Sequence, residues 1–214
     1  MRSTATARRR STSVALLAGG ALLALATTAC GPTSTNSVST TPKKSTAAAA
    51  PSGQAAGGQA AGGTGGAAST GKAPSVAKVG DTIALKGQDQ GSADDVTVVK
   101  VVDNAQSTPD GFGKPADGKR WIAVQFRLKN TGTAAYSDSP ENGATVADDK
   151  GQSYTSVVAD TTAGQSFASP VNNAPGDTAL GFITFEVPAD AKIVKAQFTL
   201  DSGFADQTGQ WNLG

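Results

Sequence analysis

The sequence predicts an all-β protein in which an antiparallel β-sandwich follows a long segment of different composition. Two observations lead to this prediction. From Lys78 onward, short runs alternate between apolar and polar residues and are separated by turn-forming residues, as half-buried strands do. No run shows the 3.6-residue apolar period of a helix over three turns. We therefore expect little helix, and we divide the chain into residues 1–29, 30–77 and 78–214.

Residues 1–29 have the three-part build of an export signal peptide. Three arginines at 8–10 form a positive start, residues 14–26 are almost entirely apolar, and small residues follow at 27–29. The apolar run of about thirteen residues is short for a membrane span, which needs roughly 20. The arginine run leaves open whether export follows the general or the twin-arginine route.

Cys30 is the single cysteine of the chain and stands directly after the signal. The stretch ALATTACG resembles a bacterial lipobox, in which small residues precede a cysteine and a glycine follows it. The resemblance implies cleavage between Ala29 and Cys30 and attachment of a diacylglycerol to the Cys30 thiol. Thr27 stands where lipoboxes usually have leucine, and a chain that is not acylated at Cys30 would be secreted instead.

Residues 30–77 are rich in Ala, Gly, Ser and Thr and contain the short repeat GQAAGGQAAGG. Such a composition cannot bury enough apolar area to offset the entropy lost on ordering the chain. We therefore predict a disordered tether, whose end-to-end distance would be roughly 35–40 Å.

The predicted strands follow one another along residues 78–214. The clearest is RWIAVQFRLKN, in which Ile122, Val124, Phe126 and Leu128 face one way and polar residues face the other. The run TALGFITFEVP is apolar on both faces, which suits a central strand. About seven such strands, with a turn at ADDKGQS and long polar loops at 104–118 and 159–177, predict an immunoglobulin-like sandwich. A single cysteine excludes the usual disulfide of such a sandwich.

Four blocks of this region resemble a known family. In order they are VGDTIAL, GKRWIAVQFRLKNTGTAAYS, DDKGQSY and APGDTALGFITFEVP. From Val79 to about Leu213 the chain resembles the secreted domain catalogued as domain of unknown function 4352. The resemblance implies an immunoglobulin-like sandwich that recurs behind lipoprotein signals in Gram-positive bacteria and shares its fold with a small secreted mycobacterial antigen. It implies no catalytic residues, because the family has no agreed activity.

Composition argues against several classes of chemistry. The chain has no histidine, which removes the commonest general base and any Ser-His or Cys-His pair. From Lys78 onward eleven basic residues face seventeen acidic ones, a formal net charge of −6 that suits nucleic acid poorly. We therefore predict no catalytic residues, no cofactor and no nucleic-acid partner. The two glutamates, Glu141 and Glu186, would have to share a cleft for glycan hydrolysis.

Three residues are candidates for binding. Asp148 and Asp149 are adjacent carboxylates that could bind calcium, although Asp-Lys-Gly between strands is also ordinary turn chemistry. Tyr136, in the loop 132–143, could be an exposed aromatic contact for a ligand or could pack against the edge of the sandwich.

These observations together predict a non-enzymatic lipoprotein on the extracellular face of the cell membrane. Its partners would be the membrane, through the lipid, and a protein or cell-envelope ligand held by the loops of the sandwich. Two alternatives stay open: a secreted hydrolase that modifies the envelope, and an accessory subunit of a membrane complex.

Overall fold

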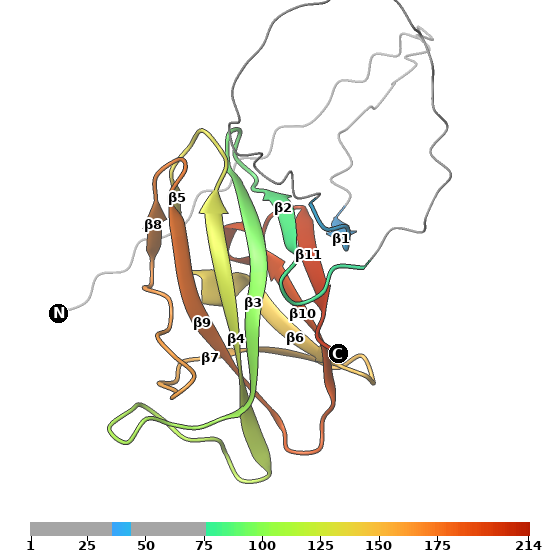
Figure 1. Ribbon diagram of the computed structural model, residues 1–214, viewed down its shortest axis with the longest axis vertical. Coiled ribbons are helices and arrows are strands. Elements are labelled where there is room, and N and C mark those ends of the chain that lie inside the picture. Colours follow the sequence, from blue (N-terminus) through green and yellow to red (C-terminus); the bar gives the residue numbers. More distant parts are fainter. Residues whose placement is uncertain (1–35, 44–75) are drawn as a thin grey trace, which may run out of the picture. The chain divides into compact units, whose positions relative to one another are not determined.

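The computed structural model describes residues 36–43 and 76–214, and these form a β-sandwich (Figure 1). The all-β immunoglobulin-like prediction is confirmed, and the described helices are two 3₁₀ turns, η1 and η2. Within the described residues, no helix is long and apolar enough to cross a membrane. The elements in order are β1 (Ser37–Ser39), β2 (Thr82–Lys86), β3 (Ala93–Ala105), β4 (Lys119–Asn130), β5 (Tyr136–Asp138), η1 (Pro140–Gly143), β6 (Ala144–Asp148), β7 (Ser153–Val157), β8 (Val171–Asn173), β9 (Thr178–Pro188), β10 (Ile193–Thr199), η2 (Asp201–Gly203) and β11 (Gln207–Asn212).

Nine strands form one continuous ladder in the order β1-β11-β10-β6-β7-β9-β4-β3-β2, and β5 pairs with β8 separately. The ladder folds into two layers at β7, whose first three residues pair with β6 and whose last two pair with β9. Figure 1 shows β3, β4 and β9 in front of β6 and β10. One end of the ladder, β2, meets β11 beside the other end, because Lys86 N donates to Gln207 Oε1 at 3.1 Å and Trp211 Nε1 donates to the Asp81 carbonyl at 2.9 Å.

The main core lies between the two layers and confirms the alternation predicted for β4. Ile122, Val124, Phe126 and Leu128 are all buried in it. The Phe126 ring packs against the rings of two residues from the opposite layer, with centroid distances of 5.3 Å to Phe198 and 6.3 Å to Trp211. Burial of these side chains is the main stabilising term of the sandwich.

A second, smaller core lies on the outer face of the β4–β9 layer. Its buried members are Ala105, Trp121, Ala123, Ala159 and Phe182. Trp121 and Ala123 alternate along β4 with the inward-facing residues, so they point away from the main core. β9 lies between β7 and β4 and has buried side chains on both faces, which explains why its sequence is apolar throughout.

The prediction of one disordered segment over 30–77 is wrong at residues 36–43. Residues 37–39 form β1, which pairs with β11 in parallel, whereas the other strand pairs described are antiparallel. Sequence reasoning missed this strand because backbone pairing at a sheet edge needs few apolar side chains, and Val38 is 58% exposed. The predicted signal 1–29, Cys30 and residues 44–75 lie outside the described residues.

Candidate ligand pocket

A pocket of about 510 Å³ opens where β7 separates from β9. Ser156 and Val157 pair with β9, and the chain then leaves the sheet at Val158. It returns to β9 at Ser166, which forms a parallel bridge with Phe182. The space enclosed by this fork falls in the size range of small-molecule sites, about 300–1,000 Å³. We call it the β7–β9 pocket.

The floor and one wall of the β7–β9 pocket are apolar. Phe182 and Ile183 of β9 and Phe167 of the returning loop line it. Gly181 lets Phe167 approach the strand, because a Cβ at Gly181 would lie 2.6 Å from both the Phe167 Cγ and its backbone nitrogen. A side chain at this position would therefore push the wall of the pocket outward.

Asp160 holds together the two long loops that the sequence predicted at 104–118 and 159–177. Its carboxylate accepts a hydrogen bond from Phe112 N at 3.1 Å, and its carbonyl accepts one from Thr108 N at 3.1 Å. Asp160 N in turn donates to the Phe112 carbonyl at 3.3 Å. The loops thus form a continuous outer layer over the second core, with Asp160 on the rim of the β7–β9 pocket.

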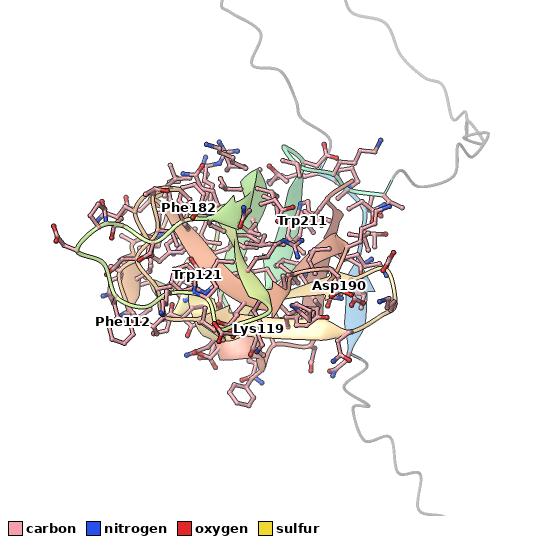
Figure 2. All side chains as sticks on the ribbon, turned by 90° about the horizontal axis from the view of Figure 1, so that it is seen from below. Phe112, Lys119, Trp121, Phe182, Asp190 and Trp211 are labelled. Atoms are coloured by element: carbon pink, nitrogen blue, oxygen red, sulfur yellow. The ribbon has the colours of Figure 1, made fainter. Side chains whose placement is uncertain are left out.

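Exposed apolar side chains surround this rim. Val158 is 82% exposed and lines the pocket, and Phe112, next to Asp160, is 68% exposed. Figure 2 shows Phe112 on the same side of the view as Trp121 and Phe182, with Asp190 on the other side. An apolar hollow with exposed apolar residues at its mouth is the usual surface of a ligand site.

Two carboxylates give the pocket its charge. Glu141 Oε1 accepts a hydrogen bond from Ser169 Oγ at 2.6 Å, and Asp160 lies on the rim. The ion pairs found in the described part of the chain involve neither residue, and no Lys or Arg lines the pocket. A negative rim that no basic side chain neutralises favours a neutral or cationic ligand over an anion.

The structure does not place Glu186 with Glu141 in the pocket. Glu186 pairs with Lys119 Nζ at 3.0 Å and accepts a hydrogen bond from Ala116 N at 3.1 Å. The hydrogen bonds from Lys119 and Ala116 N lower the pKa of Glu186 below its ordinary value, so it is an ionised partner of a lysine and not a proton donor. The geometry thus contains no pair of glutamates for glycan hydrolysis.

Of the residues predicted for binding, Tyr136 is buried in the main core with 4% of its surface exposed. Of the two alternatives left open for Tyr136, packing therefore holds and the exposed aromatic contact does not. Burial raises the pKa of the Tyr136 phenol, and within the described residues its hydroxyl has no hydrogen-bond partner. Tyr136 is not among the residues that line the pocket.

Asp148 closes the turn between β6 and β7. Its carboxylate accepts hydrogen bonds from Lys150 N at 3.0 Å, Gln152 N at 2.8 Å and Tyr154 Oη at 2.9 Å. Burial raises the pKa of Asp148, but these hydrogen bonds outweigh it and leave the pKa below its ordinary value. Asp149 is exposed beside it, and the described residues contain no group of three side chains able to hold a metal ion. The turn alternative thus accounts for Asp148.

Outside the pocket, Asp94 of β3 is the most unusual polar group. It is 1% exposed, and neither carboxylate oxygen has a hydrogen-bond partner in the part of the chain described. Burial, and then the charges of Asp95 and Asp201, raise the pKa of Asp94 to about 6.

Sequence reasoning missed the pocket residues, because Phe167, Ser169 and Asp160 lie in a loop without periodicity. One signal was present in the sequence. A strand that is apolar on both faces, as β9 is, must be covered on both, and one of the covers had to come from the long loops.

The family model described as "Domain of unknown function (DUF4352)" matches residues 88–208. No curated protein matches the sequence. Among solved structures, the chain is similar to the Bacillus subtilis protein ycdA, provisionally assigned as a lipoprotein, at 13% identity and a TM-score of 0.44. That match covers 60% of this chain and 38% of ycdA, so the chain spans well under half of that protein.

Two further structures are similar at comparable sequence identity. The secreted protein MPT63 from Mycobacterium tuberculosis has 14% identity and a TM-score of 0.44, covering 63% of this chain and 94% of MPT63. An uncharacterized β-sandwich protein from Clostridium difficile has 13% identity and a TM-score of 0.38, covering 67% of this chain and 99% of that protein.

Proposed function

The chain belongs to the DUF4352 family, and we propose that it is a non-enzymatic lipoprotein that binds a ligand outside the cell membrane. In this proposal Cys30 carries the lipid, and the sandwich binds a protein or envelope ligand through the β7–β9 pocket. The export signal and the lipobox-like stretch support the anchor.

The pocket is the observation that carries the binding part of the proposal. Its apolar floor at Phe182 and Phe167 gives a ligand an area to bury, and the carboxylates of Glu141 and Asp160 make its lining negatively charged. This combination suits a molecule with an apolar body and a cationic group, such as an amphiphile or a segment with a lysine beside apolar residues.

The test uses two simple probes that differ in the sign of their charge. Octyltrimethylammonium and octyl sulfate, both below their micelle concentrations, are titrated into the full chain with Cys30→Ala by calorimetry. We expect the ammonium probe to bind and the sulfate probe not to bind. Glu141→Gln should weaken ammonium binding about fivefold, the scale of one rim ion pair near 1 kcal/mol.

Asp190→Asn is the matched control, because it removes one exposed carboxylate in the turn between β9 and β10. It changes the net charge as much as Glu141→Gln does and should leave binding unchanged. If both variants weaken binding equally, the effect comes from the overall charge of the protein and not from Glu141. If neither probe binds, the proposed pocket is contradicted.

The lipid anchor is tested separately by labelling growing cells with a fatty-acid probe. We expect the chain to be labelled and Cys30→Ala to be unlabelled and released. Equal labelling of both would contradict the lipid anchor and would leave the proposal for the pocket unaffected.

A further inference from the structure

The outer edge of β11 is covered by two pieces of chain that are far apart in sequence. β1 covers its first half, with Ser37 opposite Gln207 and Ser39 opposite Gly209. Lys78 forms a parallel bridge with Asn212, at the end of the same strand. β1 and the segment 77–78 therefore act as two halves of one edge strand, interrupted by a long excursion of the chain.

Three hydrogen bonds hold both ends of this excursion on the sandwich. Ala77 N donates to the Thr40 carbonyl at 2.7 Å, which joins the two halves directly. Lys43 N donates to the Thr82 carbonyl at 2.7 Å, and Asn212 N donates to the Ala77 carbonyl at 2.8 Å. Ala77 is fully buried in the main core. The segment between residues 43 and 76 thus begins and ends at the same edge and cannot act as a spacer while β1 is paired.

The pairing of β1 depends mainly on its backbone. Ser37 N donates to the Asp206 carbonyl at 2.8 Å, while Val38 is largely exposed. Lys43 adds an ion pair with Asp95, at 2.6 Å, in which the lysine side chain is 51% exposed. A strand held in this way can be released by removing one backbone donor.

We propose that the sandwich lies directly against the lipid bilayer with its β1–β11 edge. This inference rests on the proposed lipid at Cys30. Seven residue steps separate Cys30 from Ser37, and they span at most ~25 Å even when fully extended. If β1 were free, 47 steps would separate Cys30 from Ala77, with a reach of well over 100 Å.

The same arrangement directs the pocket away from the membrane. In Figure 1 the β1–β11 edge lies on the right of the sandwich and β9 lies on the left. A bilayer at the β1–β11 edge therefore leaves the β7–β9 pocket and the exposed Phe112 on the side that faces the surroundings. The interaction surface is the edge formed by β1 and β11. Phe204 is 74% exposed and lies two residues before Asp206, whose carbonyl accepts the hydrogen bond from Ser37 N of β1.

The experiment measures energy transfer from the sandwich to acceptor lipids in vesicles that hold the lipidated full chain. A donor dye is placed at Phe204→Cys, near the proposed contact, or at Phe112→Cys, on the far side. Because Cys30 is acylated, the introduced cysteine is the free thiol. We expect transfer at position 204 to exceed transfer at 112 at least twofold.

A pair of proline variants tests the role of β1. Ser37→Pro removes the donor to Asp206 and should release β1 and lower transfer at position 204 at least twofold. Val38→Pro is the matched control, because backbone donors alternate along a strand and the Val38 N–H points away from β11. Amide exchange of the peptide 36–43, in the full chain with Cys30→Ala, should be fast in Ser37→Pro and slow in Val38→Pro.

The outcomes separate this inference from the anchor on which it rests. If the chain fails to partition with vesicles at all, the anchor is contradicted. If it partitions but position 204 is no closer than 112, or the two proline variants behave alike, the contact of the β1–β11 edge with the bilayer is contradicted.

Discussion

Replacing Asp94 by asparagine should stabilise this protein at neutral pH, although it alters a fully buried residue. Asp94 lies in β3 opposite Asn130 of β4 and Leu85 of β2, with the charges of Asp95 and Asp201 nearby. Its carboxylate has lost its hydration and gains no hydrogen bond within the described residues. An ionised Asp94 is thus a source of instability that a neutral side chain of the same shape would remove.

The magnitude follows from the pKa. The folded state raises the pKa of Asp94 from 3.8 to about 6, and each unit corresponds to about 1.4 kcal/mol. Above pH 6 the group is ionised in both the folded and the unfolded state, and the full penalty of about 3 kcal/mol is present. As the pH falls from 6 to 3.8, the folded state binds a proton that the unfolded state does not, and the penalty disappears.

The assay is urea unfolding of the full chain with Cys30→Ala, followed by the fluorescence of the buried Trp121 and Trp211. At pH 7, Asp94→Asn should raise the free energy of unfolding by up to about 3 kcal/mol, or the melting temperature by on the order of 10 °C. Below pH 4 the variant and the parent should converge. Asp190→Asn, an exposed control, should change neither value.

Two results would refute this reasoning. One is a variant that is less stable than the parent at pH 7, which would mean that the carboxylate makes a favourable contact. The other is a difference that stays constant between pH 7 and pH 4, which would mean that the charge of Asp94 is not the cause.

Three further predictions concern the pocket wall, the core and the β6–β7 turn. Gly181→Ala should lower the free energy of unfolding by about 1–3 kcal/mol in urea, because its Cβ would collide with Phe167; an unchanged midpoint would contradict the close approach. Trp211→Ala, at a residue with no exposed surface, should cost about 3–5 kcal/mol in the same measurement, and a loss under 1 kcal/mol would contradict its central place in the core. Asp148→Asn should destabilise the protein at pH 7 and lose this effect as the pH falls through the lowered pKa of Asp148; a difference that persists at pH 2 would show that the charge accepted by Tyr154 and the turn amides is not responsible.

The strands could be predicted because their side chains report which face is buried. In β4 four apolar residues recur at every second position, and the structure buries those four in the main core. β9 was recognisable as a central strand for a related reason, since both of its faces are apolar. The local side-chain pattern is therefore sufficient to predict a strand where one face of that strand packs against the core.

The pocket and β1 could not be predicted in this way. Asp160 joins two loops through hydrogen bonds to Thr108 N and Phe112 N, and backbone donors leave no trace in the sequence. β1 is likewise held by its backbone at an edge and carries only one apolar side chain. For Tyr136 the sequence left two alternatives open, because a single aromatic residue in a short polar segment carries no periodicity, and β5 turns it into the core.

β9 is a wall shared by two separate cores. Ile183, Phe185 and Val187 point into the sandwich, and Phe182 points into the outer layer. The loops of the outer layer can therefore change in sequence, or open locally, while the larger core keeps the sandwich folded. Substitutions in the outer loops that leave β9 and Phe167 in place should thus spare the main core, because β9 contributes to both cores and Phe167 packs against the main one.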